Sequence, residues 1–278
     1  MRNNIIAIMY DFDKTLCTRD MQEYTFIPNL GINASQFWSD ADLLREENKM
    51  DQVLTYMYLM FKKMVDNNRS LKRKYLNDMG KDIELFPGVV EWFDRINEYG
   101  KSLGFEIEHY IISSGLKEIV EGSRIGDKFK CIYASEFFYN EDGNAVWPKL
   151  AVNYTNKTQF LIRINKGILD ISDDNKLNDK MLDNDRRIST SNMIYIGDGY
   201  TDVPCMKLTK SNGGFSIAVY TDKNKDMAKK LLNDGRINYM VKSDYREGAE
   251  MDQIVKKIIN HIVIDNEIKN ITYEQTNK

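Results

Sequence analysis

Four short apolar runs, rich in β-branched residues, constrain the fold of this chain most strongly. Each run has about the length of a β-strand, and most are almost continuously apolar, which is typical of strands covered on both faces. Helix-like segments lie between the runs, so their order predicts a parallel sheet with helices on both sides. A fifth, shorter run at 237–241 could add another strand. The four runs are 5–10, 107–112, 193–196 and 215–220.

The segment between the first two predicted strands departs from this alternation. It predicts a helix after Ser35 and two more at 50–64 and 71–79, of which the helix at 50–64 has a broad apolar face. The fold class expected is therefore α/β, with a doubly wound, Rossmann-like parallel-sheet core and an inserted α-helical cap domain. The expected division is a core at 1–17 and 87–266, a helical cap at 18–86 and a frayed polar tail at 267–278.

Two further local patterns add to this layout. Asp142-Gly143 between the apolar arms 137–139 and 145–147 predicts a β-hairpin. Helical patterns at 89–99 and 249–262 would cover the sheet, the second of them closing the domain.

The composition narrows the possible functions. The chain has 278 residues, 42% of them hydrophobic, and a formal net charge of −3, so we expect a globular protein without a broad nucleic-acid-binding face. Three widely spaced cysteines and two histidines do not predict a disulfide framework or a zinc site. Without a signal-like or membrane-length apolar stretch, the expectation is a cytoplasmic protein that does not bind a membrane.

Polar residues follow three of the predicted strands. Asp11 and Asp13 follow the first strand, Ser113 follows the second, and Asp198 and Asp202 follow the third. Ligands of open parallel sheets bind beyond the carboxyl ends of the strands, so these side chains are expected to converge on one crevice.

Such a crevice suits phosphate chemistry. Carboxylates from two strands form a hard oxygen site of the kind that Mg²⁺ prefers. A serine hydroxyl and free N–H groups at a helix start can bind phosphate oxygens. Ser113 is favoured over Ser114, because it directly ends the apolar run. A lysine is needed to balance the charge, and Lys157, which opens a helix-like segment, is favoured over Lys149 and Lys166.

These residues resemble the motifs of the aspartate-nucleophile phosphatases in the haloacid dehalogenase superfamily. The motif Asp-x-Asp-x-Thr is matched at 11–15, and Gly-Asp-x-x-x-Asp is matched at 197–202. A strand that ends in serine and a lone lysine between the two motifs are matched by Ser113 and Lys157. The resemblance covers the core from 5 to about 220, and the segment 18–86 stands where the family carries a helical cap.

The resemblance implies a role for each residue. Asp11 would attack phosphorus and form an aspartyl-phosphate, and Asp13 would act as general acid and then as general base. Ser113 and Lys157 would bind the transferring phosphoryl group. Mg²⁺ would be held by Asp11, by the backbone carbonyl of Asp13 and by Asp198, with Asp202 supporting them directly or through water.

The expected activity is therefore that of a magnesium-dependent phosphatase acting on a small phosphorylated metabolite, because a cap would exclude large substrates. In the phosphoserine phosphatase branch a carboxylate after the first motif contacts the substrate amino group, and Asp20 and Glu23 lie in that stretch. Two alternatives stay open. One is phosphoryl transfer to a second alcohol, and the other is a catalytically silent binding protein with the same fold. The sequence carries no indication of the oligomeric state.

Overall fold

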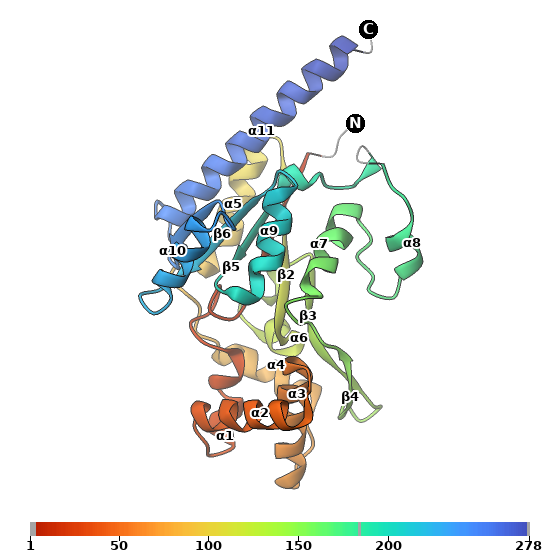
Figure 1. Ribbon diagram of the computed structural model, residues 1–278, viewed down its shortest axis with the longest axis vertical. Helices are drawn as coiled ribbons and strands as arrows, with labels where there is room; N and C mark the ends of the chain where they lie inside the picture. The colour runs from red at the N-terminus through yellow and green to blue at the C-terminus, as the bar shows by residue number, and fades with distance from the viewer. Residues whose placement is uncertain (1–3, 183–184, 277–278) are drawn as a thin grey trace. The chain divides into compact units, whose positions relative to one another are not determined.

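The computed structural model describes residues 4–182 and 185–276 (Figure 1). Seven strands form one sheet in the order β4-β3-β2-β1-β5-β6-β7. β2 pairs in parallel with β3, and β5, β6 and β7 pair in parallel with one another, whereas β4 is antiparallel to β3. The predicted α/β fold with a mainly parallel sheet is thereby confirmed. The strands are β1 Ile5–Tyr10, β2 Glu106–Leu116, β3 Cys131–Tyr139, β4 Ala145–Leu150, β5 Met193–Gly197, β6 Phe215–Tyr220 and β7 Tyr239–Lys242.

Most helices lie where the sequence patterns predict them. The segment 89–99 becomes α5, and the helix expected at 50–64 is α3, shifted by two residues. The Asp142-Gly143 turn joins β3 to β4 as predicted, with Gly143 at a φ of 73°. The helices are α1 Phe26–Asn29, α2 Ala34–Asn48, α3 Gln52–Asp66, α4 Arg73–Met79, α5 Val89–Ser102, α6 Lys117–Gly122, α7 Lys157–Lys166, α8 Asp174–Asn178, α9 Val203–Ser211, α10 Lys225–Asn233 and α11 Glu250–Thr276.

The second strand extends beyond the apolar run 107–112 on which its prediction rests. β2 continues to Leu116, so Ser113, Ser114 and Gly115 lie inside the strand. Pairing with β3 explains the extension, because Leu116 is still matched with Ser135 after an irregularity in the register. The helix that follows, α6, begins only at Lys117 and is six residues long.

The chain divides into two compact units. Unit 1 comprises Met1–Met9, Phe86–His109 and Thr158–Lys278, and unit 2 comprises Tyr10–Leu85 and Tyr110–Lys157. The boundaries fall inside β1 and β2 and at the start of α7. The predicted core and cap limits at 17 and 87 remain a prediction.

Unit 1 is a layered α/β unit. α9 packs on β5 and β6, α10 packs on β6 and β7, and α11 packs on β7 and α5. Figure 1 shows α5 and α11 on one side of these strands and α9 on the other. The fully buried ring of Trp92 on α5 meets that of Tyr245 edge-on, with a centroid distance of 5.3 Å. This unit carries the carboxyl end of β5, and with it Asp198 and Asp202.

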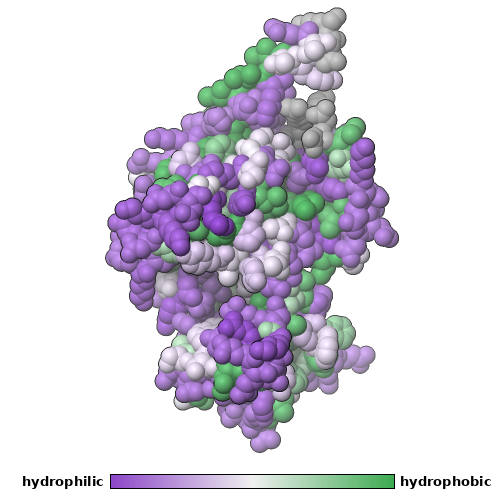
Figure 2. Space-filling model, viewed as in Figure 1, coloured by the Kyte–Doolittle hydropathy of each residue, from purple (hydrophilic) through white to green (hydrophobic). Residues whose placement is uncertain are grey.

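The expectation of a frayed tail after residue 266 is wrong, because α11 continues to Thr276. Lys269 and Asp265, which are four residues apart, form an exposed ion pair along this part of the helix. Ile264, Ile268 and Ile271 are more than half exposed on this part of the helix, and the apolar colour along its projecting end is visible in Figure 2. None of the helices in the described ranges is both long enough and apolar enough to span a bilayer.

Unit 2 contains the helices α1–α4 and the hairpin of β3 and β4. α2 packs on α3, α4 packs on α6, and α6 packs on β3. A chain of edge-on aromatic contacts runs from Phe26 through Phe37 and Trp38 to Tyr56, so these helices share one apolar interior. The unit also contains the carboxyl ends of β1 and β2 and the first residue of α7, Lys157, so the remaining predicted site residues all belong to it.

In unit 1, a buried carboxylate joins α5 to α11. Asp252 accepts hydrogen bonds from Arg95 Nε at 3.0 Å, from Lys256 Nζ at 2.9 Å and from the Gly248 N–H at 3.0 Å. Burial alone would raise the pKa of Asp252, but the bonds from Gly248, Lys256 and Arg95 outweigh it and hold the pKa below its usual range.

Replacing Asp252 with asparagine is therefore expected to lower the free energy of unfolding by about 2–3 kcal/mol at neutral pH. A carboxyl whose pKa is lower in the folded state stabilises above its unfolded pKa, and this contribution is lost as the pH falls through the folded value. The difference between the wild type and Asp252→Asn should thus shrink below about pH 4. Urea unfolding across this pH range measures it. Glu250→Gln, an exposed change on the same helix turn, is the control, and an equal loss there would contradict the prediction.

Candidate active site

Asp11 and Lys157 form a buried ion pair within unit 2. Asp11 follows β1, and its Oδ1 lies 3.0 Å from Lys157 Nζ. Asp11 is 6% exposed and Lys157 is fully buried. Lys157 is the first residue of α7, and its N–H donates to the carbonyl of Asn153, whose side chain in turn donates to Asp51. A lysine is almost never fully buried unless it is paired, so the ion pair with Asp11 accounts for the burial of Lys157.

Asp13 is held in a different environment, two residues further along. Its Oδ1 accepts the Met21 N–H at 2.9 Å and lies 3.6 Å from the Cys17 thiol. Burial, followed by the negative charges of Asp20 and Asp11, raises the pKa of Asp13 well above its usual value, although Lys14 and the Met21 N–H oppose this. A carboxyl with a raised pKa retains its proton more readily, which is the property required of a general acid.

The carboxyl-terminal part of β2 approaches Asp13. Gly115 has no room for a side chain, because a Cβ there would lie 2.9 Å from Asp13 Oδ2 and 2.1 Å from the Met21 methyl group. Ser113 is buried and its Oγ accepts the Gly115 N–H at 3.0 Å. The Ser114 carbonyl accepts hydrogen bonds from Tyr56 OH at 2.6 Å and Ser135 Oγ at 3.1 Å. The two predicted phosphate ligands thus lie in a tightly packed strand end.

In unit 1, Asp202 organises the loop that follows β5. Its Oδ1 accepts the Tyr195 hydroxyl at 2.8 Å, and its Oδ2 accepts the Asp198 and Gly199 N–H groups at 3.2 and 3.4 Å. A Cβ at Gly197 would lie 2.5 Å from the Asp202 carboxyl carbon, so only glycine leaves room for this carboxylate. Asp202 is fully buried, whereas Asp198 is half-buried.

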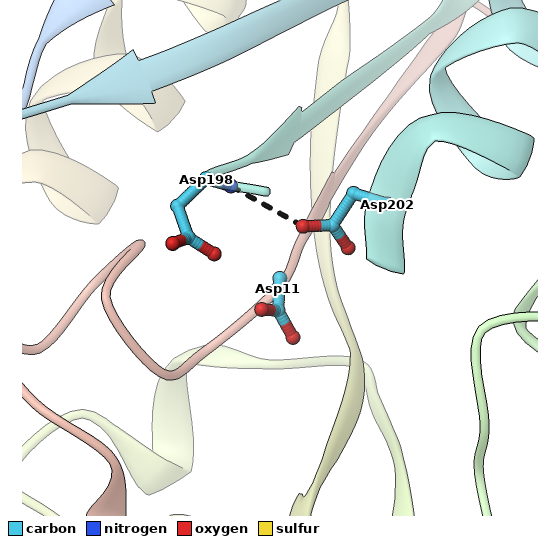
Figure 3. A group of neighbouring side chains, drawn as sticks. All are labelled: Asp11, Asp198 and Asp202. Carbon is cyan, nitrogen blue, oxygen red and sulfur yellow. Dashed lines mark hydrogen bonds between the residues drawn. The ribbon is translucent and has the colours of Figure 1, made fainter. Parts of the chain in front are cut away.

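Asp11, Asp198 and Asp202 form an acidic group. One carboxylate oxygen of each lies within 4.8 Å of the others, and Figure 3 shows the three side chains at the ends of β1 and β5 and at the start of α9. Carboxylate oxygens are the ligands that Mg²⁺ prefers. Like charges this close repel one another, and a divalent cation would offset that repulsion. The donor set therefore fits a magnesium ion.

The two carboxylates considered for substrate binding are each occupied by another side chain of unit 2. Asp20 Oδ2 pairs with Lys14 Nζ at 2.6 Å, and Glu23 Oε1 accepts the Trp38 Nε1–H at 2.8 Å. Lys14 adopts the left-handed conformation, with a φ of 57°, in the turn after Asp13.

Three contributors to the site were not predicted from the sequence. Met21 supports Asp13 through its backbone N–H, and its sulfur accepts the Leu116 N–H at 3.0 Å. Tyr56 supports the Ser114 carbonyl, and Tyr195 supports Asp202. Any residue can donate a hydrogen bond through its backbone N–H, so the sequence does not reveal the role of Met21. The tyrosine two residues before the Gly197-Asp198 pair, in contrast, could have been predicted as a neighbour of the site.

The site can be compared with known proteins. The family model of haloacid dehalogenase-like hydrolases matches residues 8–207 of this chain, which include every catalytic, phosphate-binding, metal-binding and substrate-binding residue expected above. The chain belongs to the haloacid dehalogenase-like hydrolase family. It is therefore a member of a family of hydrolases, as the motifs predicted.

This haloacid dehalogenase-like hydrolase is similar in sequence to one relative and in fold to solved structures. An uncharacterized protein of Borreliella burgdorferi is 28% identical over 291 residues, which cover 92% of this chain and 98% of the relative. A HAD family hydrolase of Salmonella enterica serovar Typhi is 18% identical, with a TM-score of 0.57 over 87% of this chain and 68% of the other. A phospho-aspartyl intermediate analogue of phosphoserine phosphatase is 14% identical, with a TM-score of 0.55 over 92% and 99%.

Proposed function

We propose that this hydrolase is a magnesium-dependent phosphatase that cleaves a small phosphate monoester through an aspartyl-phosphate on Asp11. The observation that carries the proposal is the buried pair of Asp11 and Lys157, 3.0 Å apart, within a matched Asp-x-Asp-x-Thr motif. A buried carboxylate beside a buried ammonium supplies a nucleophile and a cation for the phosphate in one place.

Two aspartates share the covalent chemistry. Asp11 attacks phosphorus, the bond from phosphorus to the ester oxygen breaks, and Asp13 gives its proton to the leaving alcohol. Asp13 then takes a proton from the water that attacks the aspartyl-phosphate, which releases inorganic phosphate and restores both carboxyl groups. The raised pKa of Asp13 supports its role as the acid of the first step.

Asp11, the backbone carbonyl of Asp13 and Asp198 would hold Mg²⁺. The ion would offset the repulsion between the Asp11 carboxylate and the anionic phosphate. Both oxygens of Asp202 already accept hydrogen bonds, so Asp202 supports the site by shaping the loop or through a water molecule.

Phosphate oxygens are bound by Lys157 and by the end of β2. The Ser113 hydroxyl is the first candidate, and Ser114 is the second. Lys157 carries three N–H donors, so it can donate to Asp11 and to a phosphate oxygen together.

The substrate proposed is a small phosphorylated metabolite of the cytoplasm. The three cysteines are free thiols, which suits a reducing compartment. Phosphoserine is the first compound to test, given the fold shared with phosphoserine phosphatase. Asp20 and Glu23 remain the proposed contacts for its amino group, but each must release Lys14 or Trp38 to reach it.

Phosphate release in the presence of Mg²⁺ tests the proposal. We expect turnover of p-nitrophenyl phosphate and of at least one metabolite in a panel that includes phosphoserine. Removal of the ion with EDTA should abolish release, and added Mg²⁺ should restore it.

Glycerol as a second acceptor separates hydrolysis from transfer. Unchanged yields of free phosphate indicate a phosphatase, whereas accumulation of glycerol phosphate would favour a phosphotransferase. If no compound of the panel is turned over, the alternative hypothesis of a catalytically silent binding protein is favoured.

A further inference from the structure

Unit 1 contains a pocket at the amino end of β5, which we call the second pocket because it lies apart from the aspartate site. Its volume is about 640 Å³, within the range of small-molecule sites. Met193, the first residue of β5, contributes to its lining, whereas Asp198 follows the other end of the same strand. Asp198 lies five residue steps beyond Met193, which in strand geometry is about 16 Å. The pocket is therefore distinct from the aspartate site.

The charged side chains described in the lining of this pocket are cations. Lys166 from α7, Arg186 from the loop before β5 and Lys269 from α11 are among its lining residues, and no carboxylate of residues 4–182 or 185–276 lines it. Lys166 Nζ donates to the carbonyls of Leu177 and Asp179, at 2.6 and 2.8 Å, and among the described residues it forms no ion pair. Its positive charge is thus held in place without being neutralised by a carboxylate.

The ion pair formed by Lys269 is exposed to solvent and is therefore weaker than a buried ion pair. Its ammonium contacts Asp265 and lies 3.4 Å from Ser191 Oγ, and the Lys269 side chain is 40% exposed. Exposed pairs of this kind contribute little stability, so an arriving anion can compete for the ammonium group at small cost. An ammonium also has a third donor to offer.

Hydroxyl groups and an apolar wall complete the pocket. Ser189, Thr190 and Ser191 line it in succession, and Leu161 and Leu208 are apolar members of the lining. Thr209, 1% exposed, also belongs to the lining, and its Oγ1 has no hydrogen-bond partner among the residues that the structure describes. A buried hydroxyl without a partner is costly unless a ligand or water satisfies it.

We propose that this pocket is a second, non-catalytic site for a small organic phosphate, with the phosphate against the cations and hydroxyls and the organic part against the leucines. Cations and hydroxyls are the usual partners of phosphate oxygens. The ligand is bound there in addition to the substrate at Asp11.

Phenylphosphonate, a non-hydrolysable dianion with an apolar ring, is a suitable probe. In full-length protein labelled with ¹³C-methyl methionine, the Met193 methyl group reports on the pocket and the Met21 methyl group reports on the aspartate site. Met193→Leu and Met21→Leu assign the two signals. We expect phenylphosphonate to shift the Met193 signal saturably, and neutral benzyl alcohol to leave it unchanged.

The variants give the decisive comparison. Lys269→Gln is expected to weaken binding at Met193 by about fivefold to tenfold, as for the loss of one hydrogen bond from a partly exposed, solvent-screened ammonium group. Lys257→Gln, an exposed change on the same helix, should leave it unchanged. Thr209→Val keeps the shape and removes the hydroxyl without a partner, so it should also weaken binding.

Three results would overturn the proposal. They are an absent Met193 response in folded protein, an equal response to benzyl alcohol, and unchanged affinity in both Lys269→Gln and Thr209→Val. A response of Met21 alone would assign phenylphosphonate to the aspartate site only, and it would likewise reject the second pocket.

Discussion

Replacing Asp11 with asparagine is expected to lower kcat for phosphate release by roughly 10³-fold or more, because the substitution removes the attacking carboxylate. Asparagine has nearly the same shape, so the turn after β1 should persist. The amide would still accept a hydrogen bond from Lys157, in place of the ion pair at 3.0 Å. Steady-state phosphate release from p-nitrophenyl phosphate, measured with Mg²⁺ in excess, gives the comparison.

A matched control separates chemistry from folding. Asp42→Asn makes the same change at an exposed position of α2, in the same unit, and should leave the rate unchanged. Circular dichroism should show that Asp11→Asn is folded. An undiminished rate in folded Asp11→Asn would refute the nucleophile, and with it the proposed function.

Replacing Lys157 with methionine should have a large effect on stability as well as on activity. Methionine fills a similar volume without charge, but it leaves the Asp11 carboxylate, 6% exposed, without its ammonium partner. Removal of one member of a buried pair costs about 3–5 kcal/mol, since the other charge stays uncompensated. Urea unfolding measures this loss of stability. The rate of phosphate release should also fall strongly, because the variant lacks the cation proposed to bind the phosphate.

The double variant Asp11→Asn/Lys157→Met tests the cause. With neither charge present, the penalty for a buried carboxylate that has lost its ammonium partner disappears, so the double variant should be more stable than Lys157→Met alone. The cycle of wild type, two single variants and the double variant gives the coupling energy of the pair. Strictly additive effects would show that Lys157 stabilises by packing and that its charge contributes little.

The sheet could be predicted because buried parallel strands leave an almost continuous apolar signature. β1 and β6 begin and end where the apolar runs do. The signature fails at the end of β2, where Ser113–Gly115 keep strand geometry although they are not large apolar residues. Pairing with β3 decides their conformation, and a partner 20 residues away leaves no local mark.

The end of α11 was predicted wrongly because the prediction relied on the polar composition of the segment and ignored the spacing of its apolar residues. The segment after residue 266 is polar overall, which suggested a frayed tail. Ile264, Ile268 and Ile271 nevertheless recur at intervals of four and three residues, which is a helical period. The ion pair of Lys269 with Asp265 follows the same period.

The residues proposed for catalysis belong to short local motifs, whereas their supports do not. Asp11 and Asp13 could be singled out because the motif that contains them is contiguous. Tyr56 meets the Ser114 carbonyl from 58 residues away, and Met21 acts through its backbone. The residues of the second pocket are scattered between 161 and 269, and no contiguous motif joins them.

The close approach of Gly197 to Asp202 has a consequence for how such a chain can evolve. Any side chain at position 197 would occupy the space of the Asp202 carboxyl group, since even a Cβ would lie 2.5 Å from it. A mutation at 197 can therefore spread only in a lineage that has already shortened or lost the side chain at 202. The two positions should be inherited together, and an ancestor that kept the aspartate must also have kept the glycine.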